Sequence, residues 1–253
     1  MKKILSVIIA IALVMSVMLV SCKKETAESL VNGAMAKTDA HSATEINGTI
    51  ELVMSVMGME IEMPIEFMMQ MTDLQSDTPT TYTKMSMSFM GEEVNSETYS
   101  EGDWVYTLAD GEGYKMSAAE SEDMGDSSGL ADVLTVFPSE VFEGVEIVKN
   151  DDGTKSVEFN LTQDLLGELY SSLVDSLSET TGGEGSEVEL SDAKIKITVK
   201  NGEVSKFVMS FDMIMSIMGI DASASCTMSF DFVAFDDDVK ITPPEGYLAF
   251  PEY

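Results

Sequence analysis

Apolar and polar residues alternate along three long segments of the chain, and each segment is interrupted by a Met-Ser-x-Met-Gly sequence. The three copies are MSVMG at 54–58, MSFMG at 87–91 and MSIMG at 215–219. Strict alternation is typical of a β-strand with one buried face, and a glycine between two such strands indicates a tight turn. The pattern therefore predicts three antiparallel β-hairpins with the repeated motif at their tips.

A type II′ turn places glycine at the first of its two central positions, which fixes a strand pairing for each hairpin. Gly58-Met59, Gly91-Glu92 and Gly219-Ile220 are then the central pairs, and Met54 lies opposite Met63. Residues directly opposite share a face, and a one-residue slip would reverse every side chain, so we expect a well-determined register. One face is then apolar: Ile50, Leu52, Met54, Val56, Ile61, Met63, Ile65, Phe67, Met85, Met87, Phe89, Val94, Phe207, Met209, Phe211, Met213, Met215, Ile217, Ala222, Ala224, Cys226, Met228, Phe230 and Phe232.

Alternation and turn residues predict further strands, which bring the total to about eleven. They lie at about 92–100, 103–108, 112–116, 145–149, 155–161 and 192–200. At Asn201-Gly202 we expect a three-residue loop with a glycine bulge, because this places Ile195 opposite Phe207. Helical periodicity and capping residues predict three helices, at about 25–38, 128–136 and 163–178. The fold class is therefore mainly β with few helices: a curved antiparallel sheet, with the helices as lids.

The N-terminus has the pattern of a secretory signal. Lys2 and Lys3 precede an apolar run from Ile4 to Val20, which ends at LVSC, residues 19–22. A short positive region, an apolar region and a small residue before the cleavage point are typical of such a signal. LVSC resembles the lipobox of bacterial lipoproteins, and this implies diacylglyceryl transfer to Cys22 and removal of residues 1–21, leaving 22–27 as an acylated tether. The alternative is an uncleaved membrane anchor with a chance cysteine; either places the rest of the chain outside the cytoplasm, tethered to the bacterial cell membrane.

The charge balance is strongly acidic. Without the leader the chain keeps 12 basic and 45 acidic side chains, and it contains no arginine. Recognition of nucleic acid needs clustered cations, so we expect no nucleic-acid partner. The acidic excess also opposes docking on anionic lipid, which leaves the acyl chains on Cys22 as the expected anchor.

Catalytic and metal-binding patterns are weak throughout the chain. His41 is the only histidine and lies in a polar segment, so a Ser/His/Asp or Cys/His set has no base at an evident site. Cys226 lies mid-strand on the apolar face, where a thiol is unreactive, and acylation of Cys22 leaves it without a disulfide partner. No zinc spacing occurs, and the acidic runs at 150–153 and 236–238 could hold Ca²⁺ only weakly, because neither matches a calcium loop. We therefore predict a protein that is not an enzyme and has no cofactor.

The whole pattern resembles the LolA/LolB and LprG/LppX superfamily of lipid and lipoprotein carriers. The stretches that carry the resemblance are YSEGDWVYTLADGEGYKMS at 99–117 and VKNGEVSKFVMSFDM at 199–213, within a lipoprotein of about eleven predicted strands. The resemblance implies that residues 28–253 form one half-open β-barrel, a monomer whose helices fill the open, concave side over a hydrophobic cavity.

The apolar face allows more than one function. Eight of its 24 residues are methionine, a flexible and polarizable side chain that is common on surfaces with varied apolar partners. An adaptable cavity for a lipid-like or acylated ligand would use such a face, but so would an ordinary methionine-rich core or a surface for a partner protein. We predict the first, with this cavity lining: Met54, Met63, Met85, Met87, Phe89, Phe207, Met209, Phe211, Met213, Met215, Cys226, Met228 and Phe230. The alternative is a non-enzymatic cell-surface binding or sensory module with a filled core.

Overall fold

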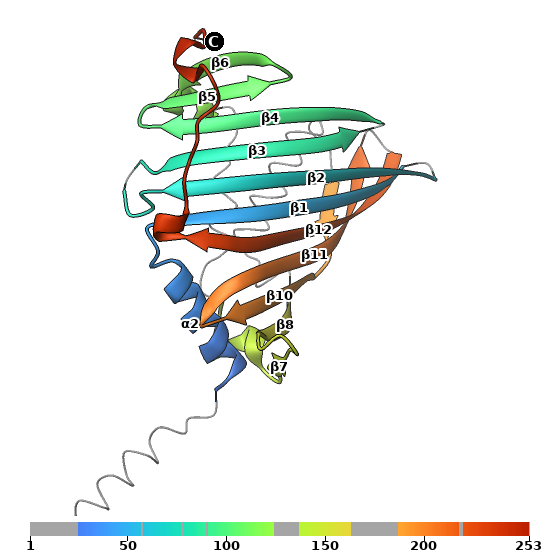
Figure 1. Ribbon diagram of the computed structural model, residues 1–253. Coiled ribbons are helices and arrows are strands. Elements are labelled where there is room, and N and C mark those ends of the chain that lie inside the picture. The colour runs from blue at the N-terminus through green and yellow to red at the C-terminus, as the bar shows by residue number, and fades with distance from the viewer. Residues whose placement is uncertain are drawn as a thin grey trace, which may run out of the picture.

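The computed structural model describes residues 25–56, 58–76, 78–89, 91–123, 137–162, 187–217 and 220–252. Twelve strands form one sheet in the order β6-β5-β4-β3-β2-β1-β12-β11-β10-β8-β7, and β9 pairs with β11 beyond the end of β10. Every pairing between these strands is antiparallel. Strands β6 and β7 lie at opposite edges and do not meet, so the twisted sheet stays open (Figure 1). The mainly β, half-open architecture with few helices is confirmed.

The elements agree with the predicted ones except for one additional strand and one short helix. The strands are β1 Ala43–Val56, β2 Met59–Thr72, β3 Thr80–Phe89, β4 Glu92–Glu101, β5 Trp104–Ala109, β6 Glu112–Ser117, β7 Val148–Lys149, β8 Lys155–Leu161, β9 Glu187–Leu190, β10 Ala193–Lys200, β11 Glu203–Ile217 and β12 Ile220–Phe235. The helices are α2 Ala27–Thr38 and α3 Ala118–Asp123, with short 3-10 turns η1 Ser139–Phe142, η2 Asp236–Asp238 and η3 Tyr247–Ala249. Strand β9 and helix α3 were missed, because four and six residues are too short for a periodic signal.

The predicted hairpin register is wrong by two residues in all three hairpins. The structure pairs Val56 with Met59, Phe89 with Glu92 and Ile217 with Ile220. In the first two hairpins, Gly58 and Gly91 therefore occupy the second central position of the turn. Gly58 and Gly91 have φ values of +81° and +88°, which glycine adopts without strain at that position. Because strand side chains alternate with a period of two, this shift preserves both faces, and the predicted apolar face is correct.

The loop between β10 and β11 also differs from its prediction. Lys200 pairs with Glu203 across a two-residue turn, in which Asn201 and Gly202 both have positive φ. The expected three-residue loop with a glycine bulge is therefore wrong. A bulge occurs within the ladder instead: Thr198 pairs with Lys206 and Val199 with Val204, so Ser205 of β11 is the extra residue. Phe207 therefore faces Ile197, and Ile195 faces Met209. The bulge restores the apolar face as expected, although the partners are displaced by two residues.

Helix α2 confirms the first predicted helix. Thr26 and Ser29 form a capping box, in which each side chain accepts a hydrogen bond from the other residue's backbone N–H. At the other end, the backbone N–H of Val204 donates to the hydroxyl of Thr38 at 3.0 Å, which ties the helix to the start of β11. The helices expected at 128–136 and 163–178 lie outside the described residues. Among the described helices, none has the length and apolar composition needed to cross a lipid bilayer.

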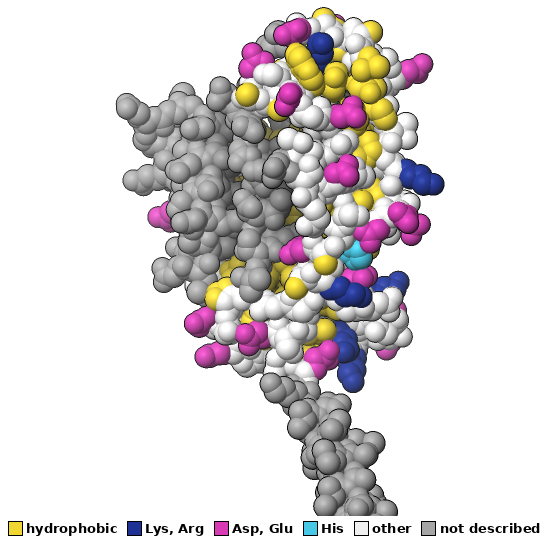
Figure 2. Space-filling view, turned by 90° about the vertical axis from the view of Figure 1, so that its left-hand side faces the viewer, with side chains coloured by type: hydrophobic (Ala, Val, Ile, Leu, Met, Phe, Trp, Pro, Cys, Tyr) yellow, Lys and Arg dark blue, Asp and Glu magenta, His cyan; other side chains and the backbone are white. Residues whose placement is uncertain are grey.

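Two hydrophobic cores lie on opposite faces of the sheet. The larger one lies on the face that carries Phe207, here called the inner face, and includes side chains from β8, β10, β11, β12, α2 and η1. The smaller one lies on the opposite, outer face and contains Tyr82, Tyr99 and Tyr106, which face one another across β3, β4 and β5. Residues 239–252, here called the C-terminal strap, run from the end of β12 across this outer face to β6 (Figure 1). Hydrophobic side chains gather at the end of the molecule that holds β5, β6 and the C-terminus (Figure 2).

Candidate functional site

An unbroken row of apolar side chains crosses the inner face through eight strands. Each member is paired in register with the next: Val94, Met87, Ile65, Ile50, Met228, Met209, Ile195 and Phe159, on β4, β3, β2, β1, β12, β11, β10 and β8. Neighbouring rows are also largely apolar, with Leu52 between Met63 and Cys226. The predicted apolar face is therefore one continuous surface across β4–β1 and β12–β8.

The two halves of this row differ in burial. Phe159, Ile195, Met209 and Met228 are buried, with Ile195 fully excluded from solvent, whereas Ile50, Ile65, Met87 and Val94 are only half-buried. The buried half packs against α2, which contributes Leu30, Val31, Ala34 and Met35, and against Phe142 of η1. Apolar coverage by these elements is thus concentrated over β8–β12.

The predicted cavity residues divide along the same line. Seven of them belong to the buried core: Phe207, Met209, Phe211, Met213, Cys226, Met228 and Phe230. Four are half-buried on β1, β2 and β3: Met54, Met63, Met85 and Met87. The side chains of Phe89 and Met215, and the whole of Cys22, lie outside the described residues. The structure thus places all eleven described side chains on one face but brings only seven into the packed core.

A glycine on the inner face makes room for an aromatic ring. Gly48 on β1 pairs with Phe67 on β2, and a Cβ atom built on Gly48 would lie 2.0 Å from Cζ of that ring. The ring therefore lies across the backbone of Gly48, where any other residue would displace it. It also packs against Phe230 with a centroid separation of 5.8 Å, so it links the half-buried and buried parts of the face.

Cys226 lies in the buried half, on the face predicted for it, and its thiol is free. Burial raises the pKa of its thiol to about 11, because the thiolate would lose hydration without gaining a charged partner. At neutral pH Cys226 therefore stays a thiol. Electrophilic thiol reagents, which react with the thiolate, should modify it only on unfolding.

The single histidine holds the start of the C-terminal strap. His41 Nδ1 lies 2.7 Å from Oδ2 of Asp236, and its ring stacks on Phe235 with a centroid separation of 4.2 Å. The other carboxylate oxygen of Asp236 accepts hydrogen bonds from the backbone N–H and the hydroxyl of Ser42. These bonds, that from His41 first, lower the pKa of Asp236 to about 2. Asp236 has a φ of +50°, and the chain reverses there from β12 into the strap.

Sequence reasoning missed the outer-face cluster that receives the strap. The ring of Tyr247 packs edge-on against Tyr99 and Tyr106, at centroid separations of 5.1 and 4.9 Å. Phe250 lies over Gly113 of β6, and the backbone N–H of Lys115 donates to the carbonyl of Pro251 at 2.9 Å. The available signal was the presence of three tyrosines at outward positions of otherwise polar strands. Large aromatic side chains on a sheet face are usually covered by another part of the protein.

Among the residues that the structure describes, no three His, Cys, Asp or Glu side chains are grouped as metal ligands. Acidic side chains are scattered over the described surface in the view of Figure 2 and do not form one patch.

Comparison with protein-family models gives no match, and neither does comparison with curated protein sequences. Comparison with solved structures finds LprF from Mycobacterium bovis, at a TM-score of 0.42 and 12% identity over 87% of this chain and 97% of that chain. It also finds a DUF1329 family protein from Desulfovibrio piger, at a TM-score of 0.28 and 8% identity over 84% of this chain and 92% of that one. The ywiB protein from Bacillus subtilis has a TM-score of 0.23 and 9% identity over 78% and 99% of the two chains.

Likenesses at these TM-scores indicate nothing about ligand or activity. The structure shows the fold class that the sequence predicts, an open antiparallel sheet with few helices among the described residues.

Proposed function

We propose that this protein is a membrane-tethered, extracytoplasmic lipoprotein that binds or carries a lipid-like molecule on the inner face of its half-barrel. The observation that supports the proposal is the apolar row across eight strands, of which only the β8–β12 half is buried. The half-buried members on β1–β4 offer an apolar surface that continues directly from the core.

Burial of this surface by an acyl chain is favourable. Each methylene group removed from water contributes about 0.8 kcal/mol, so affinity should rise with chain length until the available surface is covered. Met63, Met85 and Met87 can adjust to chains of different shape, because methionine has three rotatable bonds and no branch. Headgroup selectivity should be weak, since the chain has no arginine with which to grip a phosphate or carboxylate.

The role that we propose is non-enzymatic. Cys226 is held as a thiol in the core, and both ring nitrogens of His41 lie near carboxylates, Asp236 and Glu203, at the start of the strap. The tether that we propose is an acylated Cys22, so a Cys22→Ser variant should lose membrane partitioning. Unchanged fractionation with membranes would contradict acylation as the anchor.

The ligand proposal can be tested with the polypeptide from Lys23 onward, produced without its leader. Fatty acids of increasing length, diacylglycerol and phospholipid should bind at micromolar concentration, measured by native mass spectrometry and by displacement of a fluorescent fatty acid. Met87→Asp should abolish uptake, because it places a charge in the half-buried part of the row. Ser88→Asp is the matched control, since Ser88 is the exposed neighbour on the opposite face of the same strand.

Absence of uptake by a folded protein would reject the carrier hypothesis. Uptake that is the same in the Met87→Asp and Ser88→Asp variants would place the ligand elsewhere. Without uptake, the buried β8–β12 half would favour the alternative, a cell-surface binding or sensory module with a filled core.

A further inference from the structure

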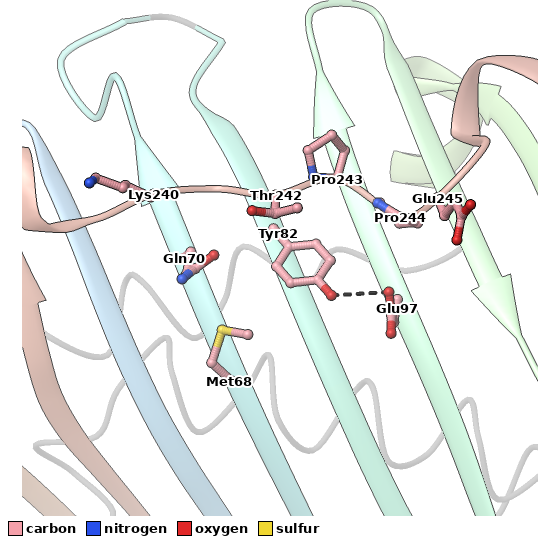
Figure 3. Close-up of a pocket in the computed structure, with 9 residues that line it drawn as sticks. All are labelled: Met68, Gln70, Tyr82, Glu97, Lys240, Thr242, Pro243, Pro244 and Glu245. Atoms are coloured by element: carbon pink, nitrogen blue, oxygen red, sulfur yellow. Dashed lines mark hydrogen bonds between the residues drawn. The ribbon is translucent and has the colours of Figure 1, made fainter.

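The C-terminal strap is anchored at both ends and crosses a hollow between them. Its first anchor is Asp236, bonded to His41 and Ser42, and its second is formed by Tyr247 and Phe250 on the outer-face cluster. Between these anchors, residues 240–245 pass over the outer face of β2, β3 and β4 (Figure 3). The hollow is open to solvent and has a volume of about 620 Å³.

The hollow under the strap has a defined roof and floor. Pro243 and Pro244 form part of the roof, and their fixed φ angles limit its collapse onto the sheet. The floor comes from Met68 and Gln70 on β2, Tyr82 on β3 and Glu97 on β4. This volume lies within the range of about 300–1,000 Å³ that is typical of ligand pockets in proteins.

A second hollow adjoins the first. It has a volume of about 420 Å³ and is lined by Lys84, Asn95, Ser96, Glu97, Leu108, Asp110 and Gly111. Glu97 lines both hollows, so they lie side by side on the outer face, the first under the strap and the second over β3, β4 and β5, and we consider them together. We call the pair the strap groove.

Glu97 at the junction is held rigidly. The hydroxyl of Tyr82 donates to its Oε2 at 3.0 Å, and Nζ of Lys84 lies 3.3 Å from its Oε1. On the floor beside it, the amide nitrogen of Gln70 donates to Glu45 at 2.8 Å, which orients that side chain as well. Fixed polar groups bind a ligand with less loss of conformational entropy than mobile ones.

The chemistry of the lining favours an uncharged, polyhydroxylated ligand. The carboxylates of Glu97, Asp110 and Glu245 are largely balanced by the ammonium groups of Lys84 and Lys240, so neither sign of charge dominates. Side-chain amides, which both donate and accept, occur in both hollows as Gln70 and Asn95, and the first hollow adds the hydroxyl groups of Tyr82 and Thr242. A sugar hydroxyl likewise both donates and accepts. Met68, Tyr82 and the two prolines add apolar surface for the C–H face of a sugar ring.

We propose that the strap groove binds an uncharged oligosaccharide, with one part under the strap and another along Asn95 in the second hollow. The site lies on the opposite face of the sheet from the lipid-binding surface, and it does not depend on that function.

The test uses the full chain, purified from membranes in a detergent without a sugar headgroup. Isothermal titration calorimetry with cellohexaose, chitohexaose and maltohexaose should show binding of at least one hexasaccharide. Binding should be about tenfold tighter than for the corresponding disaccharide, a difference of about 1.4 kcal/mol, because a disaccharide occupies only one hollow. Glu97→Ala should weaken binding of the hexasaccharide at least about tenfold.

Two milder variants protect the test against misfolding. Thr242→Ala on the strap and Asn95→Ala in the second hollow each remove an exposed polar group. Each variant should weaken hexasaccharide binding several-fold. Glu62→Ala, an exposed carboxylate on β2 outside the groove, should change nothing.

Three outcomes would overturn the proposal. The first is no binding of any hexasaccharide at millimolar concentration, and the second is equal binding by wild type and by both the Thr242→Ala and Asn95→Ala variants. The third is tighter binding of hexalysine, competing with the sugar, which would mean that the groove selects cations. None of these outcomes would bear on lipid uptake.

Discussion

The two ends of the sheet bury opposite faces. At the β8–β12 end, the inner face packs against α2 and η1, and Phe207, Ile195 and Ile197 are fully buried there. At the β3–β6 end, the outer face carries the tyrosine cluster, and the C-terminal strap covers it. On the inner face of β1–β4, Ile46 is buried in the inner core, whereas Ile50, Ile65, Met87 and Val94 are half-buried.

This difference shows how an open sheet can build a core at each end while part of one face stays half-buried. Each end of the sheet needs another element packed against it, because a sheet with both faces exposed to solvent has no hydrophobic core. The layers lie on opposite faces, and half-buried side chains such as Ile50, Leu52 and Phe67 connect the inner core to the rest of the inner face. Mutations in the two cores should therefore differ in how much they lower the free energy of unfolding and in which part of the chain they expose.

The largest effect is expected at the inner core. Phe207→Ala removes a fully buried ring and should lower the free energy of unfolding by about 3–5 kcal/mol. Urea denaturation monitored by circular dichroism measures this loss. A change below about 1 kcal/mol would mean that the inner core at this end is not the main source of stability.

The next effect is expected where the cores meet the half-buried face. Gly48→Ala places a Cβ against the ring of Phe67, so the ring must move, at a cost of about 1–3 kcal/mol. Gly33→Ala is the matched control, because a Cβ there has nothing within 4 Å and alanine favours the helix. Equal stability of the two variants would contradict the packing of Phe67 over Gly48.

The outer core should give a smaller effect confined to the strap. Tyr247→Ala removes two edge-on aromatic contacts, each worth about 0.5–1.5 kcal/mol. The strap should then become accessible to protease, and the amide of Lys115, which donates to Pro251, should exchange faster with solvent. Amides of β10 and β11 serve as the internal control, and a parallel loss of their protection would mean that the two cores unfold together.

The smallest effect is a pH dependence at the first anchor of the strap. The folded-state pKa of Asp236 is about 2, below its ordinary value of 3.8, so its carboxylate contributes stability above about pH 4. This contribution is lost as the pH falls from about 4 toward 2, because the protonated group can no longer accept the bonds from His41 and Ser42. The urea midpoint of the wild type should therefore approach that of Asp236→Asn over this range. A constant difference between the two proteins would contradict the lowered pKa.

The comparison also explains which parts of the fold could be predicted. The inner face followed from alternation alone, and it survived a register error of two residues because strand side chains repeat every two residues. Alternation did not determine which residues pair across each hairpin. A glycine such as Gly58 can occupy either central position of a turn, and only the strand pairing in the structure shows which one it occupies. The strap was not predicted either, because Lys240 to Glu245 have no periodicity and two prolines exclude a regular element.

For the candidate site, the sequence identified the apolar surface but could not show which part of it is buried and which part is half-buried. Met209 and Met87 look alike in the sequence, each within an alternating strand before a glycine turn. One is buried and the other is half-buried, because β11 lies beside α2 whereas β3 lies at the other end of the sheet.

The sequence by itself determined which side of each strand is apolar, because that property belongs to local spacing. Strand order, and with it the layer that covers each part of the sheet, was decided only by the tertiary structure. Pairing of β1 with β12 joins segments about 180 residues apart and sends the strap across the outer face. Such a pairing is selected by the free energy of burying the inner and the outer face of the sheet together. No single segment of the chain therefore specifies its own partner strand.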